Sequence, residues 1–103
     1  MYVRLVEFSG ADAEKHDRVV ETLREDVVPT LRRFDGFAGF IGLYDGENGR
    51  ARAVLLWETK EQAETAENEL MERRRRIAGG LGLTVESEDL YEAPVVEVDA
   101  VRA

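Results

Sequence analysis

The sequence predicts one α+β domain in which the elements follow the order β-α-β-β-α-β. Three observations predict it. Four segments are rich in β-branched and aromatic residues, two charged segments between them carry apolar residues at helical spacing, and a glycine-rich turn joins the two middle strands. A chain of 103 residues has the length of a single domain with one core. We therefore treat residues 1–103 as one domain, with residues 93–103 as a short C-terminal tail or arm.

The first half of this order begins with a strand over residues 2–8, which is β-branched and aromatic. Ser9, with Asp12 three residues later, predicts the cap of a helix. Apolar residues then recur every three or four positions through residues 13–34, so one helical face is apolar. Pro29 lies inside this pattern and predicts a kink of the last turns or an end of the regular helix just before it.

A hairpin forms the middle of the domain. Asp35-Gly36 ends the first helix, and residues 37–44 form the second strand. Its two internal glycines indicate close approach of the backbone or a bulge. The turn at residues 45–49 has glycines where positive φ is needed, and residues 50–57 return as the third strand.

The second helix has clear boundaries. Thr59 and Gln62 form a capping box at its start, and Ala78-Gly79-Gly80 ends it. A last strand lies between Leu83 and Tyr91. The β-prone segment Val95–Val98 is either an edge strand or an arm.

These elements make a ferredoxin-like domain, with two helices on one face of a four-stranded antiparallel sheet. The strands are apolar on both faces: in the first strand, Val3 and Leu5 lie on one face while Val6 and Phe8 lie on the other. A sheet with one face in water should instead alternate apolar and polar residues. The second face therefore needs a cover, and we expect a homodimer packed sheet to sheet as an α/β barrel. The alternative cover is the chain's own tail at Val95–Val98.

Composition excludes several classes of function. The 22 acidic and 14 basic residues give a net charge of −8. A nucleic-acid-binding protein needs a basic surface, so this charge argues against that function. With no cysteine and one histidine, the chain offers no disulfide, thiolate zinc site or two-histidine metal site, so we expect no metal and no cofactor. No apolar run approaches the roughly 20 residues of a membrane span. With no signal-like segment either, we expect a cytoplasmic protein.

Three stretches resemble the dimeric α/β-barrel superfamily, and within it the antibiotic-biosynthesis-monooxygenase-like domains. They are Phe34-Asp35-Gly36-Phe37, the segment from Leu56-Trp57-Glu58-Thr59 to Ala63, and Leu90-Tyr91-Glu92. The resemblance covers about residues 2–92. It implies a dimer whose sheets form a barrel, with a pocket between each sheet and its own helices.

Members of this superfamily include cofactor-independent monooxygenases acting on aromatic polyketides, haem-degrading oxygenases and polyketide cyclases. The haem-degrading pattern has an asparagine on the first strand and a histidine on the second helix. Here the first strand offers Glu7 and the second helix has no histidine. Cyclase-like relatives use paired histidines, and this chain has only His16. The resemblance therefore favours neither haem degradation nor histidine-based cyclisation.

Aromatic side chains are the first candidates for the site. Trp57 ends a strand where its ring is placed to line the pocket, and its N–H suits a substrate oxygen. Tyr44 and Tyr91 carry hydroxyls that suit a phenolic substrate, and Phe40 adds an aromatic wall. The plainer interpretation is that all four fill the core. We nominate Trp57 and Tyr44 as catalytic, and Phe40 and Tyr91 as substrate-pocket residues.

Charged residues supply the remaining candidates. Glu7 is a possible general base if it is buried, and Arg4, on the other face of the same strand, suits an anionic substrate. His16 is the residue of choice for acid–base chemistry near neutrality, although its charged neighbours indicate a solvated face. The run Arg73–Arg76 is more typical of a helix C-terminus than of an anion-binding site. We expect its arginines to form ion pairs with Glu69 and Glu72, or with the acidic residues 86–89.

We expect a small-molecule-binding dimeric barrel that acts as a cofactor-independent monooxygenase on an aromatic or polyketide-like substrate. The alternative is a non-catalytic dimeric barrel with a structural or stress-response role. A third hypothesis is an effector-binding module, which usually accompanies a further domain. A cavity above about 300 Å³ beside Tyr44 and Trp57 favours ligand binding, and a filled interior favours the non-catalytic protein.

Overall fold

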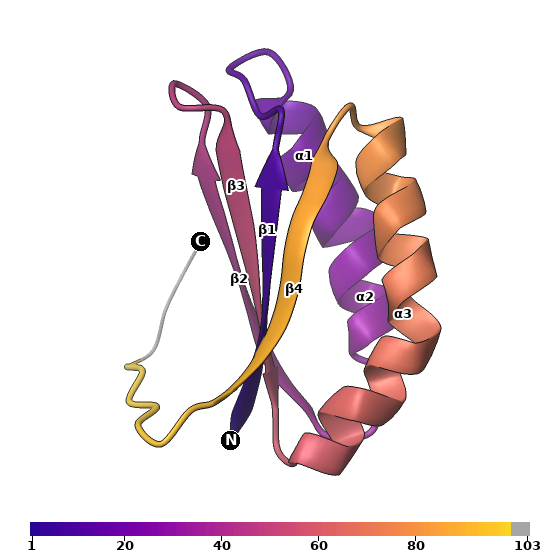
Figure 1. The fold of residues 1–103 in the computed structure, drawn as a ribbon, viewed down its shortest axis with the longest axis vertical. Coiled ribbons are helices and arrows are strands. Elements are labelled where there is room, and N and C mark those ends of the chain that lie inside the picture. The colour runs from indigo at the N-terminus through magenta and orange to yellow at the C-terminus, as the bar shows by residue number, and fades with distance from the viewer. Residues whose placement is uncertain (100–103) are drawn as a thin grey trace.

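The computed structural model describes residues 1–99 and consists of one sheet covered on one side by helices (Figure 1). The four strands are antiparallel, in the order β2-β3-β1-β4. Their bounds are β1 (Tyr2–Ser9), β2 (Phe37–Asp45), β3 (Arg50–Trp57) and β4 (Thr84–Glu92). The helical layer consists of α1 (His16–Thr22), the π-helical turn η1 (Leu23–Val27), α2 (Val28–Leu31) and α3 (Lys60–Gly80). The predicted ferredoxin-like α+β fold is confirmed.

The first helical segment consists of α1, η1 and α2 in succession. It runs without a break through Pro29, and the π-helical turn η1 lies just before this proline. Within this turn the N–H of Val28 bonds to the carbonyl of Leu23, five residues earlier. Pro29 has no N–H to offer the carbonyl of Glu25, and the wider turn accommodates the missing bond. The helix therefore does not end before Pro29 but continues to Leu31.

The start of this segment differs from the predicted one. β1 extends through Ser9, which pairs with Arg50 and Thr84, and the Ser9 hydroxyl donates to Glu86 Oε2 at 2.6 Å. Ser9 is therefore not the helix cap, and that prediction was wrong. Asp12 takes this role for the turn before α1, since its Oδ1 accepts the N–H of Lys15 at 2.9 Å.

Helix α3 begins as predicted, because Thr59 Oγ1 accepts the N–H of Gln62 at 3.1 Å. Its buried face carries Ala63, Ala66 and Leu70, and these small side chains let the helix lie close to the sheet. The main core cluster joins this face to the sheet. Its buried members are Val6, Leu31, Ala53, Leu55, Trp57, Ala63, Ala66 and Leu70.

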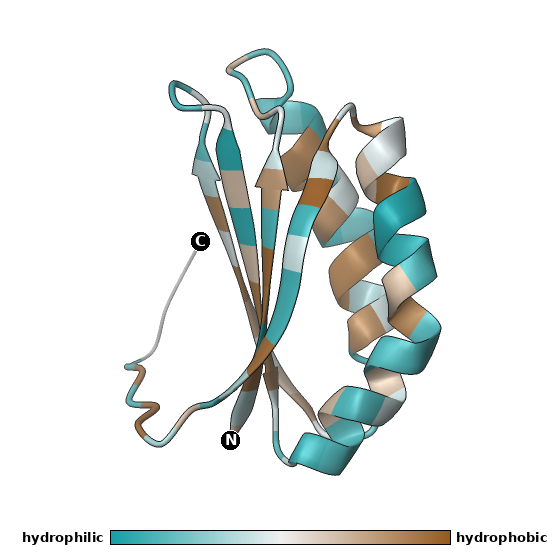
Figure 2. Ribbon diagram, in the orientation of Figure 1, coloured by the Kyte–Doolittle hydropathy of each residue, from teal (hydrophilic) through white to brown (hydrophobic). Residues whose placement is uncertain are grey.

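The other side of the sheet carries no helix (Figures 1 and 2). Pairing places Val3 opposite Leu56 and Tyr91 on this side, and Leu5 opposite Val54. We call it the open face; its apolar residues are Val3, Leu5, Ile41, Leu43, Val54, Leu56 and Tyr91. Ile41 and Leu43 remain 45% and 48% exposed. The strands are thus apolar on both faces, as the sequence predicts.

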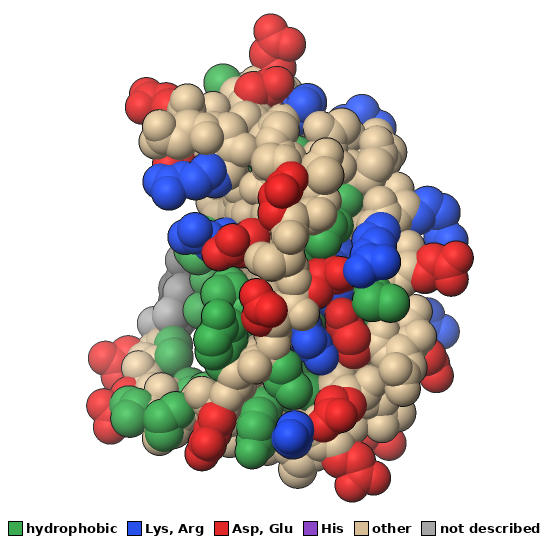
Figure 3. All heavy atoms as spheres, viewed as in Figure 1, with side chains coloured by type: hydrophobic (Ala, Val, Ile, Leu, Met, Phe, Trp, Pro, Cys, Tyr) green, Lys and Arg blue, Asp and Glu red, His purple; other side chains and the backbone are tan. Residues whose placement is uncertain are grey.

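The tail leaves the sheet at the end of β4. The N–H of Ala93 still bonds to the carbonyl of Met1 at 2.9 Å, but residues 93–99 form no strand. Val95 is 75% exposed and Val98 64%. Apolar side chains of the sheet and of the tail gather on one side of the molecule (Figure 3). Residues 100–103 of the predicted tail lie outside the described residues.

Candidate functional site

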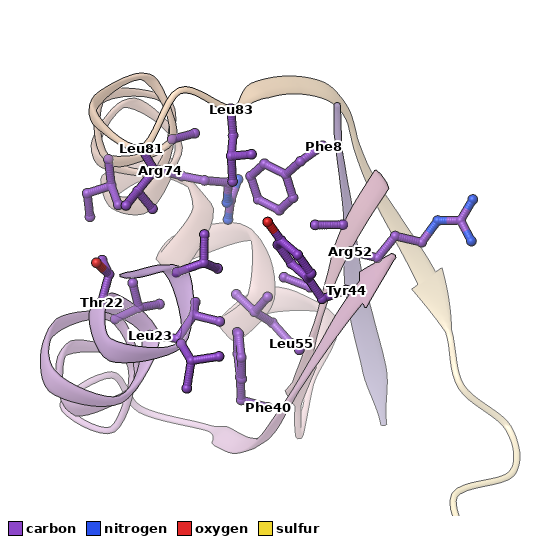
Figure 4. Close-up of a pocket in the computed structure, with 18 of the residues that line it drawn as sticks. Phe8, Thr22, Leu23, Phe40, Tyr44, Arg52, Leu55, Arg74, Leu81 and Leu83 are labelled. Carbon is purple, nitrogen blue, oxygen red and sulfur yellow. The ribbon is translucent and has the colours of Figure 1, made fainter. Parts of the chain in front are cut away.

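A cavity of about 230 Å³ lies between the helix-facing side of the sheet and the helical layer (Figure 4). Strands β1 to β3 contribute its floor, and the helical segments contribute its walls. The lining is mainly apolar, with Phe8, Val19, Leu23, Phe40, Leu55, Leu70 and Leu83 among its members. Its volume is below the roughly 300 Å³ expected from the sequence for a ligand site. The interior is nonetheless not filled.

Small residues on the sheet keep this space open. Ala51 and Ala53 of β3 and Gly42 of β2 all line it. A Cβ atom on Gly42 would lie 3.3 Å from Leu23 Cδ1 and 3.4 Å from a ring carbon of Phe40. Glycine at this position therefore leaves room that any side chain would occupy.

Two polar side chains meet at the end of the cavity near the β2–β3 turn. The Tyr44 hydroxyl donates to the carbonyl of Asp12 at 2.5 Å and accepts the N–H of Asp12 at 3.2 Å. The ring of His16 packs edge-on against Tyr44, with centroids 5.2 Å apart. His16 Nδ1 lies 2.9 Å from Asp17 Oδ1. The hydroxyl of Tyr44 thus anchors the loop before α1, and His16 is the titratable group beside it.

Arg74 of α3 is a cationic group on the cavity wall, and it is tied to two carboxylates. It donates to both oxygens of Glu67 at 2.7 and 2.8 Å and to Glu88 Oε2 at 2.7 Å. Arg75 also donates to Glu88 at 2.6 Å, and Arg4 Nε lies 3.6 Å from Glu67 Oε1. We call these five residues the ion-pair cluster.

The cluster shifts the pKa of two members. Burial by itself raises the pKa of Glu88, but the hydrogen bonds and charges of Arg75 and Arg74 outweigh it, and the pKa lies below its ordinary value. Burial by itself lowers the pKa of Arg74, yet Glu67 and Glu88 raise it above its ordinary value. Both groups therefore stay charged beside the cavity.

These pairings differ in part from the predicted ones. Glu69 and Glu72 were expected to pair with Arg73 and Arg76, but Arg73 bonds instead to Asp26 of η1 at 2.6 Å. The expected partner from the returning strand is present, since Glu88 lies on β4. Tertiary neighbours thus outweigh the spacing of four residues along the helix.

Three of the seven candidate site residues line the cavity, namely His16, Tyr44 and Phe40. Trp57 does not line the cavity. It is 1% exposed and packs edge-on against Phe34 and Phe37, so it belongs to the core beside the cavity.

The other three candidates lie elsewhere. Arg4 faces the helices but is held in the ion-pair cluster. Glu7 and Tyr91 lie on the open face, because alternation along a strand turns them away from Phe8 and Leu90. Glu7 Oε1 is 3.2 Å from Arg52 Nε. Arg52 borders the cavity, but its guanidinium points away from it in Figure 4.

Sequence reasoning did not identify Gly42, Leu23, Thr30 or Arg74 as lining residues. The sequence does contain an indication for Gly42, since a glycine within a strand indicates close approach of another group. Pro29 is a similar indication for Leu23, because the turn that precedes this proline places Leu23 at the cavity. The position of Arg74 depends on how α3 rotates against the sheet, which the arginine run does not encode.

Within residues 1–99, no group of three or more histidine, cysteine, aspartate or glutamate side chains is arranged to hold a metal ion. In the same part of the chain, no helix is both long and apolar enough to cross a bilayer.

Solved structures share this fold. A candidate antibiotic biosynthesis monooxygenase from Deinococcus radiodurans matches with a TM-score of 0.69 at 17% identity, over 97% of this chain and 100% of the other. A monooxygenase from the gene ActVA-Orf6 of Streptomyces coelicolor, in complex with nanaomycin D, gives 0.69 at 14% identity, over 97% and 92%. Rv0793 from Mycobacterium tuberculosis gives 0.58 at 14% identity, over 96% and 100%.

No protein-family model and no curated protein sequence matches the chain. The structural likenesses show that the chain has the fold of antibiotic-biosynthesis-monooxygenase-like domains, as the resemblance predicted.

Proposed function

We propose that this protein binds a flat aromatic or polyketide-like molecule in the cavity and oxygenates it without a cofactor. The observation that supports binding is the apolar space above Gly42, Ala51 and Ala53. A flat ring that enters this space buries apolar surface of the ring and of the lining side chains, which favours binding by about 25 cal/mol per Å² buried.

The size of the cavity restricts the ligand. A cavity of about 150 Å³ already accommodates benzene. The 230 Å³ here suits one ring or two fused rings. Larger ring systems require Leu23 and Phe40 to move.

The residues at the end of the cavity supply the chemistry that we propose. We assign the proton of the neutral ring to Nδ1, which lies 2.9 Å from Asp17 Oδ1, so that the other ring nitrogen of His16 takes the proton of a phenol. The resulting anion forms a C–O bond with dioxygen at a ring carbon, and the peroxide formed takes the proton back from His16. The C–H bond at that carbon and the O–O bond then break, so that one oxygen atom remains as a carbonyl and the other leaves as water. Tyr44 holds the loop that positions His16.

Oxygenation rests on analogy with the monooxygenase that shares the fold and was solved with nanaomycin D. The test is oxygen consumption with a panel of phenols and hydroxyquinones of one and two rings. We expect consumption by the wild-type protein and its loss in His16→Ala. Binding without consumption across the panel contradicts the oxygenase proposal and favours a non-catalytic barrel that binds a ligand.

We also propose a homodimer in which the open faces of two chains pack together. Ile41, Leu43 and Tyr91 are 45 to 53% exposed there, and a second copy offers the same apolar surface. Light scattering should give twice the mass of one chain, and Ile41→Glu should give a monomer. A monomeric wild type at micromolar concentration contradicts the dimer.

A further inference from the structure

A groove runs beside the cavity, between the first helical segment and β2, which is an edge strand. Four of the residues that line this groove also line the cavity: Val20, Leu23, Phe40 and Gly42. The two spaces are therefore neighbours that share one wall.

That wall consists mainly of two side chains. Leu23 Cδ1 and a ring carbon of Phe40 each lie within 3.4 Å of the position that a Gly42 Cβ would take, so they meet above this glycine. Figure 4 shows both on the same side of the cavity. Both are only partly buried. The boundary between the groove and the cavity is thus formed here by side chains, which move on shorter timescales than helices and strands.

The groove carries a distinct pattern of charge. Along the helical segment, its lining alternates apolar and basic at steps of four residues: Val20, Arg24, Val28 and Arg32. The β2 side adds no charge between residues 37 and 44. As an edge strand, β2 also leaves alternate backbone groups without a partner in the sheet.

Within residues 1–99, four arginines form no ion pair or side-chain hydrogen bond. Two of them, Arg24 and Arg32, line the groove, and the other two, Arg33 and Arg76, lie outside it. Arg50, Arg52 and Arg73, in contrast, each contact a carboxylate. The chain has 22 acidic and 14 basic residues, so carboxylates are abundant. Two unpaired cations in one groove are suited to an anion from outside the chain.

We infer that the groove binds the anionic end of the molecule whose ring lies in the cavity. This inference rests on the proposed function and narrows its substrate class. The substrate is an aromatic acid: one or two flat rings carrying a short linker that ends in a carboxylate or a phosphate. The ring lies over Gly42, the linker passes between Leu23 and Phe40, and the anion lies between Arg24 and Arg32.

The experiment compares matched ligands by isothermal titration calorimetry. The probes are 2-naphthoxyacetate, its neutral isostere 2-naphthoxyacetamide, and 2-naphthyl phosphate. Two exposed arginines should favour an anion by about five- to tenfold at low salt, and added salt should reduce this preference. Preference for the carboxylate identifies a carboxylic acid as the ligand, and preference for the phosphate identifies a phosphate ester.

The variant that tests the groove is Arg24→Gln/Arg32→Gln, which should bind the acid and the amide equally while its affinity for the amide is unchanged. The matched control is Arg33→Gln/Arg76→Gln, which removes two exposed arginines outside the groove and should keep the preference. Equal affinities in the wild type, or an equal loss in the control, overturn the inference.

Two further outcomes also overturn it. If none of the three naphthyl probes binds the wild type, the proposed function fails as well. If Arg24→Gln/Arg32→Gln alters the mass in light scattering but not the ligand preference, the groove contacts the acidic C-terminal tail of a second copy, which carries Glu97 and Asp99.

Discussion

Ala53→Leu should make the protein more stable, because it adds apolar atoms to the apolar lining of the cavity. Ala53 lies in the middle of β3, is buried, and lines the cavity. Leucine adds three carbon atoms, and burial of each contributes about 0.8 kcal/mol, which gives about 2 kcal/mol in all. Imperfect fit to the cavity subtracts up to about 1 kcal/mol. We therefore expect a net gain of about 1 to 2 kcal/mol.

The assay is urea denaturation at one fixed protein concentration, since any self-association also contributes to stability. With a slope of about 1 to 2 kcal/mol per M for a chain of this size, the midpoint should rise by about 1 M. Thr65→Leu is the matched control, because Thr65 is exposed on α3, and the change should stay within about 0.5 kcal/mol. A loss of more than 1 kcal/mol in Ala53→Leu, at unchanged slope, would show that β3 is already tightly packed and would refute the reasoning.

Three other predictions follow from named contacts. Glu88→Gln should cost about 1 to 2 kcal/mol, because Arg74 loses one of its two carboxylate partners and keeps Glu67. Since the pKa of Glu88 is lowered, the wild type should keep this contribution above the ordinary glutamate pKa and lose it as the pH falls through the lowered value; urea midpoints measured against pH should fall less steeply in the variant. Tyr44→Phe should cost about 1 to 2 kcal/mol, measured by urea, because the N–H and carbonyl of Asp12 lose their partner. Ile41→Glu should convert a dimer to a monomer in light scattering while its far-ultraviolet circular dichroism spectrum stays unchanged; a dimeric variant contradicts the role of the open face.

Most of the fold follows from local signals in the sequence. The cap at Thr59 predicts the start of α3, and the glycine-rich turn predicts the hairpin of β2 and β3. Both signals are reliable because they act within a few residues. Alternation along the strands also identifies the open face, since side chains at odd positions of β1 point away from Val6. Ser9 was misassigned because strand pairing, which is a long-range interaction, competes with a local cap.

The site is less accessible to such reasoning. His16, Tyr44 and Phe40 do line the cavity, but its existence depends on the small volume of Gly42 facing Leu23 across two elements. Arg74 lies at the cavity wall, where it pairs with Glu67 of the same helix and with Glu88 of β4. Side-chain volumes and pairings of this kind depend on the packed layers, and no spacing along the chain specifies them.

Titration of the protein with 2-naphthol, a phenol of two fused rings, tests most directly whether the cavity binds a flat aromatic molecule. We predict saturable binding of one molecule per chain to the wild type and to Thr65→Leu, and its loss in Ala53→Leu, whose added side chain occupies the floor of the cavity. No saturable binding to the wild type, or equal affinity in Ala53→Leu, would contradict the account.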